Sequence, residues 1–187
     1  DRLRSRGLGD VYKRQIYDAQ TLSLTADIAG SFTLEVLKGT LMAMDERLMA
    51  VRPHPDQINT AANIRAILKD SPMLERCRGH RVQDALSIRC MPQLHGPVKK
   101  AVKDAQATLA IELNSSVDNP LIFDEEDGGA VALMGCNADG TYAGMASDNL
   151  CIAITDLCKM SNSRIDRLLN SLVSELPAFL NKNADFN

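Results

Sequence analysis

Two long stretches of this sequence repeat core-type side chains at the three- and four-residue spacing of an α-helix. These positions are Leu94, Val98, Ala101, Ala105, Leu109 and Leu113 in the first stretch, and Leu150, Ile154, Leu157, Ser161, Ile165, Leu168 and Leu172 in the second. Residues at this spacing share one helix face, so each stretch predicts a long amphipathic helix, the second spanning ~35–40 Å. A chain of 187 residues is too short to cover two such one-sided helices by itself. We therefore predict an all-α, mostly helical bundle of long helices that other subunits complete.

Shorter elements are expected around these stretches. Residues 16–49 favour a helix with a break at Gly39–Thr40, and a proline-containing loop precedes a helix that Asp56 or Asn59 would cap. Gly96-Pro97 is typical of a helix start, since proline suits a first turn. Two short apolar runs within residues 121–136 predict a small hairpin or loop.

Composition limits the class of protein. Hydrophobic residues make up 45% of the chain and charged residues 24%, which is typical of globular proteins. The five cysteines form no Cys-x-x-Cys pair, and Cys77-x-x-His80 is not a usual zinc spacing, so no metal site is predicted. Because a signal peptide and long apolar runs are lacking in the sequence, we expect a reduced, cytoplasmic protein with no membrane partner.

The first fifteen residues differ from the rest in charge. They hold five basic and two acidic side chains, a net charge of +3. Since the whole chain carries −3, residues 16–187 carry −6. A basic arm is compatible with nucleic-acid binding, but no basic, aromatic-containing surface continues it, and no nucleic-acid partner is predicted. The segment "DVYKRQ" (residues 10–15) resembles the in-frame translation of a transposon adapter used to prepare sequencing libraries. We therefore interpret residues 1–15 as non-native.

The segment "VQDALSIRCMPQLHG" (residues 82–96) places polar side chains in an otherwise apolar stretch. They are Gln83, Asp84, Ser87, Arg89 and Gln93. A buried polar group without a hydrogen bond costs roughly 1–3 kcal/mol, so this group is expected to bind a polar ligand or to pair across a subunit contact. An ordinary structural arginine is the alternative. Since a planar guanidinium suits a carboxylate, Arg89 suggests a small ligand that carries one.

Residues for acid–base catalysis are poorly represented. His54 lies between prolines, His80 lies in a charged segment, and His95 lies beside Gly-Pro. The sequence has no Ser/His/Asp arrangement, phosphate-binding loop or metal cluster. These residues alone therefore do not make a complete catalytic site.

Several motifs resemble those of the histidine/phenylalanine ammonia-lyase family. The family pattern Gln-Asp-x-Tyr-Ser-x-Arg-x-x-Pro-Gln is matched at all but one position of residues 83–93. The patterns Glu-x-Asn and Asp-Asn-Pro-Leu are matched within residues 112–121. The segment "RPHPDQ" (residues 52–57) precedes them, and residues 146–154 and 176–180 follow in the family order. The resemblance covers essentially the whole chain after its first fifteen residues.

The resemblance implies a mostly helical homotetramer whose sites are assembled from several subunits. It implies elimination of ammonia from histidine or an aromatic L-amino acid, through a methylidene-imidazolone electrophile formed from an internal Ala-Ser-Gly. That tripeptide is absent from the chain and is expected upstream of Ile16, so residues 16–187 would be a partial ammonia-lyase helical domain. By the same resemblance, Arg89 would bind the substrate carboxylate, Gln83 would support the site, and Asn137 would lie beside the substrate pocket.

Three positions depart from the family pattern. Leu86 replaces a tyrosine, Ala138 replaces a pocket phenylalanine, and Asp139 replaces a histidine or glutamine. With Leu86 and Ala138 the pocket would be larger and would lack a phenol that orients substrate or handles a proton, although Tyr142 is close enough in sequence to compensate. An ammonia-lyase, an aminomutase with the same electrophile and an inactive helical scaffold all remain open. Under each, this chain alone is expected to be inactive and to self-associate through exposed apolar helix faces.

Overall fold

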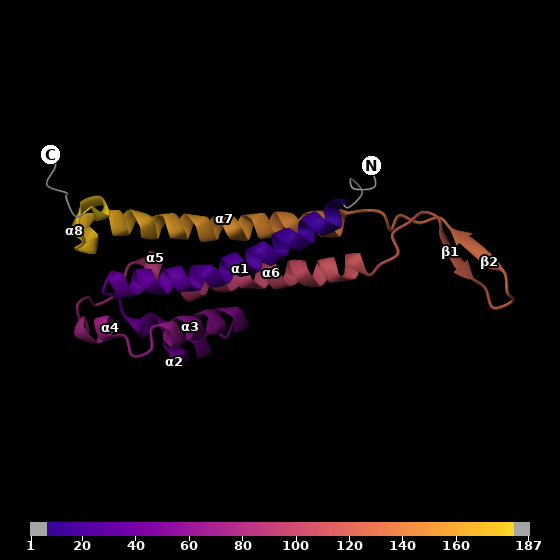
Figure 1. Ribbon diagram of the computed structural model, residues 1–187. Helices are drawn as coiled ribbons and strands as arrows, with labels where there is room; N and C mark the ends of the chain where they lie inside the picture. Colours follow the sequence, from indigo (N-terminus) through magenta and orange to yellow (C-terminus); the bar gives the residue numbers. More distant parts are fainter. Residues whose placement is uncertain (1–6, 182–187) are drawn as a thin grey trace.

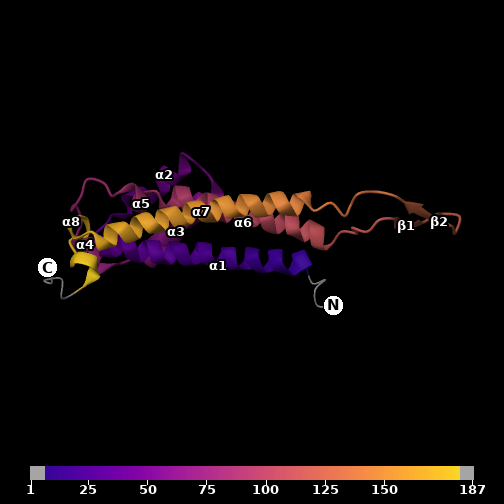
Figure 2. The ribbon, with the colours of Figure 1, turned by 90° about the horizontal axis from the view of Figure 1, so that it is seen from above.

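The computed structural model describes residues 7–181, and its main layer is built from three long helices (Figure 1). They are α1 (Gly7–Val36), α6 (Met91–Leu113) and α7 (Thr141–Leu169). The three helices lie side by side, as the view from above in Figure 2 also shows. The predicted all-α class is confirmed. None of the helices in the described part of the chain combines the length and apolar character needed to cross a membrane.

Short helices cover one end of this layer. They are η1 (Leu41–Met44), α2 (Glu46–Ala50), α3 (Pro55–Ile67), α4 (Pro72–Arg76), α5 (Leu86–Arg89), α8 (Ser171–Ser174) and η2 (Ala178–Leu180). Of these, α3 packs against both α6 and α1. The predicted break near Gly39 is confirmed, since α1 ends at Val36 and the chain turns back towards α3.

A two-stranded hairpin extends beyond the other end of the bundle (Figure 1). Its strands are β1 (Leu121–Asp124) and β2 (Ala130–Leu133), which pair in antiparallel register with Leu121 opposite Leu133. Gly128 has a φ of +83°, a backbone conformation that glycine adopts without steric cost, and it closes the turn. The hairpin predicted within residues 121–136 is therefore confirmed.

The hydrophobic core is concentrated at the end that carries the short helices. Its largest cluster of buried side chains joins α1, α3, α5 and the start of α6, and consists of Leu34, Leu37, Met44, Met49, Ala61, Ile64, Leu68, Ile88 and Met91. Towards the hairpin the contacts between the long helices are thinner, with only small clusters such as Ala19, Val102 and Leu150. The best-packed part of the chain thus lies beside α5, which contributes Ile88 to it.

Some predicted helix boundaries are wrong. The long helix α6 starts at Met91 instead of Gly96-Pro97, because Pro92 already occupies its first turn and Pro97 lies further along on an exposed face. Gly96 lies against the backbone of α3, where an added Cβ would approach the Gln57 nitrogen to 2.8 Å. Gly96 therefore marks a close helix–helix contact instead of a helix start. At the amino end, α1 begins at Gly7 and not at Ile16.

The apolar side chains that predicted the first helix do not face the core of this chain. Ile28, Phe32 and Val36 are 45%, 57% and 41% exposed, respectively. The buried face of α1 instead carries small and polar residues, among them Ala26 and Asp27. The apolar stripe of α1 is thus left uncovered by its own chain, and its cover by other subunits stays a prediction.

Candidate functional site

The segment predicted to carry the site folds as the single helical turn α5, directly before α6. Asp84 anchors the approach to this turn, because its buried carboxylate accepts a hydrogen bond from the backbone N–H of Thr40 over 2.7 Å. Ser87 and Ile88 face inward and are buried, whereas Leu86 is exposed. Ser87 and Ile88 therefore pack this side of the turn against the core, and Leu86 lies on its exposed side.

Arg89 and Gln83, two of the predicted site residues, are in direct contact. Nη1 of Arg89 donates a hydrogen bond to Oε1 of Gln83 over 2.7 Å. Nε of Arg89 and Oε1 of Gln93 are buried and have no hydrogen-bond partner among the residues that the structure describes. Leaving such groups unpaired costs roughly 1–3 kcal/mol each. The two atoms are therefore the unsatisfied polar groups of this segment in the single chain.

A hollow of about 610 Å³ lies beside Arg89. Gln83, Leu86 and Arg89 line it together with Arg167 of α7 and Glu175, which follows α8. The structure thus brings three of the five predicted site residues together in one hollow. Arg81 and Asp84 also line it, so the hollow has three guanidinium groups and two carboxylates, and the excess of cations favours an anionic ligand.

The two acidic residues of this hollow, Asp84 and Glu175, are already paired within the chain. One carboxylate oxygen of Glu175 bonds Lys38, and the other lies 3.0 Å from Nε2 of His80. The hydrogen bonds from Lys38 and then from His80 hold the pKa of Glu175 below its ordinary value. Because Glu175 is paired in this way, it leaves the charges of Arg89 and Arg167 available to a ligand.

Asn137 and Ala138, the other two predicted site residues, lie at the opposite end of the long helices. They follow β2 and precede α7, whereas Arg89 precedes α6. The 23 residues of α6 separate the two places by ~34 Å. Nδ2 of Asn137 donates a long hydrogen bond of 3.4 Å to the Ser116 carbonyl, so Asn137 contacts the loop before the hairpin. A single chain does not bring Asn137 or Ala138 to Arg89.

The residues after Ala138 organise the start of α7. Oδ1 of Asp139 accepts a hydrogen bond from the backbone N–H of Thr141 over 2.9 Å. The hydrogen bonds from the side chain and backbone of Thr141 hold the pKa of Asp139 below its ordinary value. Tyr142 is 75% exposed. Asp139 therefore has a local structural contact, and the phenol of Tyr142 is directed to solvent in this chain.

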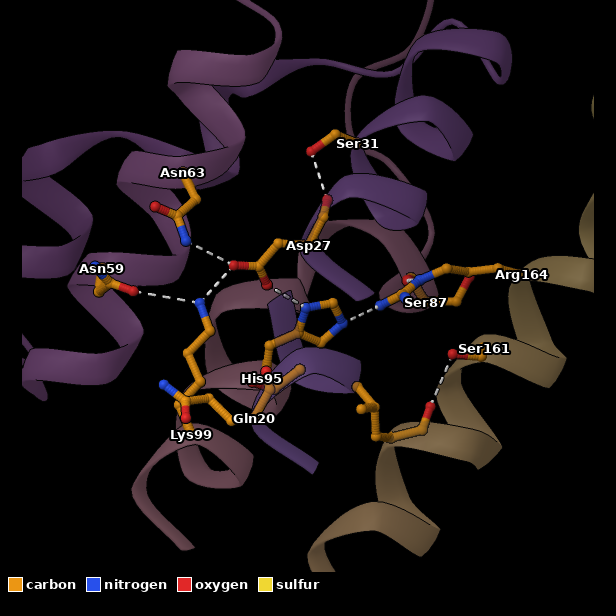
Figure 3. Close-up of polar contacts among 12 residues, drawn as sticks. Gln20, Asp27, Ser31, Asn59, Asn63, Ser87, His95, Lys99, Ser161 and Arg164 are labelled. Carbon is orange, nitrogen blue, oxygen red and sulfur yellow. Dashed lines mark hydrogen bonds and ion pairs between the residues drawn. The ribbon is translucent and has the colours of Figure 1, made fainter. Parts of the chain in front are cut away.

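A polar network that the sequence analysis missed centres on the buried side chains of Asp27, His95, Lys99 and Arg164 (Figure 3). It joins five helices through Asp27, Asn59, Asn63, Ser87, His95, Lys99 and Arg164. Nδ1 of His95 lies 2.8 Å from Oδ1 of Asp27. The other carboxylate oxygen of Asp27 accepts hydrogen bonds from Lys99 and, over 2.8 Å, from Asn63. Asp27 is thus the anion at the centre of the network.

Arg164 connects this network to α5. Its Nε donates a hydrogen bond to the Ser87 carbonyl over 2.7 Å, and its Nη2 lies 2.9 Å from Nε2 of His95. Since a guanidinium group can only donate, Nε2 of His95 is the acceptor. The ring is therefore neutral, carries its proton on Nδ1, and donates that proton to Asp27.

Burial shifts the pKa values of the network. Burial lowers the pKa of His95 below its ordinary value, and the hydrogen bond to Asp27 opposes this only in part. Burial on its own would raise the pKa of Asp27, but the hydrogen bonds from His95, Lys99 and Asn63 outweigh it and leave that pKa lowered. Burial also lowers the pKa of Arg164 to about 10, so this side chain stays protonated at neutral pH.

The sequence contains few features that predict this network. Asp27 and His95 are 68 positions apart, and the position of His95 beside Gly-Pro gives no sign of a buried partner. The available signals were an aspartate inside the small-residue face of a predicted helix and the four-residue spacing of His95 and Lys99. Within residues 7–181, no group of three or more His, Cys, Asp or Glu side chains is arranged to hold a metal ion.

Comparison with known proteins establishes the family. The sequence profile described as aromatic amino acid lyase matches residues 13–187. The chain belongs to the aromatic amino acid lyase family, and the resemblance drawn from the motifs is confirmed.

The chain is 40% identical to a histidine ammonia-lyase of Caldanaerobacter subterraneus over 172 residues, which are 92% of this chain and 33% of that protein. It is 43% identical to a histidine ammonia-lyase of Alkaliphilus metalliredigens, again covering 92% of this chain and 33% of that protein. The chain thus spans about a third of the length of the curated relatives that it matches.

Solved structures agree in fold. Histidine ammonia-lyase from Trypanosoma cruzi matches with a TM-score of 0.83 and 34% identity, over 96% of this chain and 32% of that one. A tyrosine aminomutase from Streptomyces globisporus matches with a TM-score of 0.80 and 30% identity, over 92% of this chain and 36% of that one. The helical architecture is therefore that of the ammonia-lyases and their aminomutase relatives.

Proposed function

We propose that the whole protein containing this chain eliminates ammonia from histidine or an aromatic L-amino acid, and that Arg89 binds the substrate carboxylate. The observation that carries the proposal is the buried, unpaired Nε of Arg89. Because Gln83 occupies Nη1, the edge formed by Nε and Nη2 remains for two parallel hydrogen bonds to a carboxylate. The names of the histidine ammonia-lyase relatives support the reaction.

The other site residues have subordinate roles. Gln83 orients the guanidinium group, and Leu86 and Ala138 shape the pocket for the substrate side chain. The methylidene-imidazolone group, which acts as the electrophile that activates the amino group for departure, would be formed by an Ala-Ser-Gly segment of the whole protein. The unpaired guanidinium N–H beside the hollow fits the substrate carboxylate, so this chain contributes to binding and orienting the substrate.

The distribution of the site residues along the chain supports a site shared between subunits. Since ~34 Å of helix separates Arg89 from Asn137 and Ala138, a complete pocket would combine these residues from different copies in a homotetramer. We place this assembly in the cytoplasm. Residues 16–187 would be the partial ammonia-lyase domain, and residues 1–15 would be non-native.

An aminomutase is the second candidate. The chain is similar to a tyrosine aminomutase at 30% identity and to a phenylalanine aminomutase of Pantoea agglomerans at 32% identity. These similarities support an aminomutase as the alternative. An inactive scaffold is the third candidate, and the replacements Leu86, Ala138 and Asp139 motivate it. The products of the whole protein separate the three: an unsaturated acid with released ammonia, a β-amino acid, or neither.

The test is steady-state kinetics of the whole protein with histidine, phenylalanine and tyrosine, before and after Arg89→Gln. We expect KM to rise by roughly 10- to 100-fold, since hydrogen bonds to a charged group contribute about 1.5–3 kcal/mol. Arg47→Gln is the matched control, because Arg47 is 90% exposed and pairs only with the neighbouring Asp45 among the described residues. Unchanged kinetics in Arg89→Gln would remove Arg89 from the site, and the absence of turnover with every amino acid would support the scaffold.

A further inference from the structure

We propose that Arg164 is a positioning residue for Arg89: by holding the α5 backbone, it sets the orientation in which Arg89 receives the substrate carboxylate. This inference rests on the proposed function, since it assigns Arg164 an effect on the same carboxylate site. Arg164 is not among the side chains that line the hollow beside Arg89. Any effect of Arg164 on substrate binding must therefore pass through another residue.

The helical turn that carries Arg89 needs an external support. α5 has only four residues, and its N-cap, Ala85, provides no side-chain hydrogen bond to the turn. An isolated turn of helix is unstable because the cost of ordering its backbone exceeds what its few hydrogen bonds return. The position of α5 is thus determined by contacts with the rest of the fold.

Arg164 provides such a contact at the centre of the turn. It reaches across from α7, and its Nε donates to the Ser87 carbonyl over 2.7 Å. Ser87 lies two residues before Arg89 in the same four-residue helix, so the two residues move together. Arg164 is 4% exposed, and a charge-assisted hydrogen bond in a buried place is both strong and directional.

The guanidinium group of Arg164 is itself fixed from the other side. Its Nη2 donates to His95, which in turn donates to Asp27, as Figure 3 shows. Asp27 is held by Lys99 and Asn63. The resulting chain of hydrogen bonds starts on α1, passes through α6 and α7, and ends at the α5 backbone. It connects the best-packed part of the core to the turn that presents Arg89.

Orientation matters for the predicted role of Arg89. Two parallel hydrogen bonds to a carboxylate require the guanidinium plane to be aligned with the ligand, and displacements near 1 Å are enough to reduce catalysis by roughly 100-fold. Gln83 holds one nitrogen of Arg89, but Gln83 precedes α5 and does not fix the turn itself. The packing of Ile88 holds the turn against the core, and Arg164 adds a directional hydrogen bond to its backbone.

A double-mutant cycle on the whole protein tests this assignment. Arg164→Lys retains a buried cation, but a single ammonium nitrogen does not reproduce the planar fork that spans the Ser87 carbonyl and His95. We expect it to raise KM for the amino-acid substrate by roughly tenfold, with a smaller change in kcat. In an Arg89→Gln background the same substitution should change KM by less than about twofold, because the residue through which Arg164 acts is already gone.

Binding of a ligand without a carboxylate provides the second readout. Inhibition by the amine that corresponds to the substrate should be equal in wild type and Arg164→Lys. Lys159→Met is the control for loss of a cation from α7, since the Lys159 side chain is 73% exposed and contacts only Asp156 among the described residues. Folding of each variant is checked by its thermal midpoint, and Arg164→Gln, which keeps an N–H donor, replaces Arg164→Lys if the latter does not fold.

Each outcome separates the two proposals. If Arg164→Lys raises KM equally in the wild-type and Arg89→Gln backgrounds, or weakens amine binding as much as substrate binding, Arg164 does not act through Arg89 and the inference is wrong. If Arg89→Gln itself leaves KM unchanged, the proposed role of Arg89 fails first. A KM effect of Arg164→Lys that vanishes in the Arg89→Gln background establishes the positioning role.

Discussion

Nδ1 of His95 lies 2.8 Å from Oδ1 of Asp27, and both side chains are almost completely buried, with 0% and 2% of their surfaces exposed. Because Arg164 donates to the other ring nitrogen of His95, the ring is held as a neutral donor between a carboxylate and a guanidinium group. Protonation of His95 would place a second donor against Arg164 and break that hydrogen bond. The pair therefore makes the stability of the fold sensitive to pH.

Stability should fall as the pH drops below the ordinary pKa of histidine. Burial lowers the pKa of His95 in the folded chain from 6.5, so between the folded and unfolded values the unfolded state binds more protons. The contribution of His95 is complete above pH ~6.5 and is lost as the pH falls, with a slope of at most about 1.4 kcal/mol per pH unit. The pKa of Asp27 is also lowered, from 3.8, and adds a further loss at more acidic pH. Thermal midpoints of the whole protein between pH 8 and pH 3 would measure both steps.

The His95 step has a specific control. His95→Gln should flatten the dependence of the thermal midpoint on pH between pH 5 and pH 7, at the cost of a lower midpoint at pH 8. His54→Gln should leave the curve unchanged, because His54 is exposed at the N-cap of α3 and makes no capping hydrogen bond with its side chain. Identical pH profiles for wild type and His95→Gln would mean that the ring does not titrate as described.

Asp27→Asn should destabilise the fold by about 3–5 kcal/mol, since it leaves buried Lys99 and Arg164 without their anion. Chemical unfolding of the whole protein measures this loss. Lys99→Met in the Asp27→Asn background should recover part of it, because one of the two unpaired cations is then replaced by an apolar side chain. Asp104→Asn is the surface control: its i, i+4 pair with Lys100 is exposed, and the change should stay below about 0.5 kcal/mol. Equal losses for Asp27→Asn and Asp104→Asn would contradict the central role of Asp27.

The sequence predicted the existence of α6 and α7 because periodicity is a local property, although Leu172, the last residue of the second stripe, lies beyond α7 and is exposed. The positions of Val98, Ala101 and Ala105 on the buried face of α6 follow directly from their spacing. The motif around Arg89 was also predictable, because its residues lie within eleven positions of one another. Arg89 contacts Gln83 and shares a hollow with it, and the role of this group in a substrate site stays a prediction.

Features that depend on contacts between distant segments were not predictable. The Asp27–His95 pair joins two helices that meet only in the folded chain, and neither residue lies in a recognisable local pattern. On α1, the apolar stripe at Ile28 and Phe32 suggested a core-facing side, although small and polar residues occupy that place in this chain. Periodicity identifies an apolar face but does not tell whether the same chain or another copy covers it.

Gly30→Ala should destabilise the chain although alanine is the better helix former. A Cβ at Gly30 would lie 2.4 Å from Sδ of the fully buried Met91, and 3.5 Å from Nη1 of Arg164. The gain of about 1 kcal/mol in helix propensity is opposed by an overpacking cost of about 1–3 kcal/mol, and Met91 has little room to move. We expect a lower midpoint of chemical unfolding. Gly144→Ala on α7 is the matched control, because a Cβ there meets nothing within 4 Å, and it should be neutral or slightly stabilising. A stabilised Gly30→Ala variant would show that α1 and α6 separate easily.

Substitution of the exposed apolar stripe of α1 should weaken self-association without unfolding the chain. Ile28 and Phe32 are 45% and 57% exposed in a single copy, so replacing both with serine removes little packing within that copy. If these side chains are covered by another subunit, as we propose, the double variant should shift the 187-residue chain towards smaller species in light scattering, while its helical circular dichroism is retained. Gln20→Ser, also on an exposed position of α1, should leave the size distribution unchanged. A wild-type chain that is monomeric from the start, or a double variant that associates as strongly as wild type, would show that this face of α1 does not contribute to assembly.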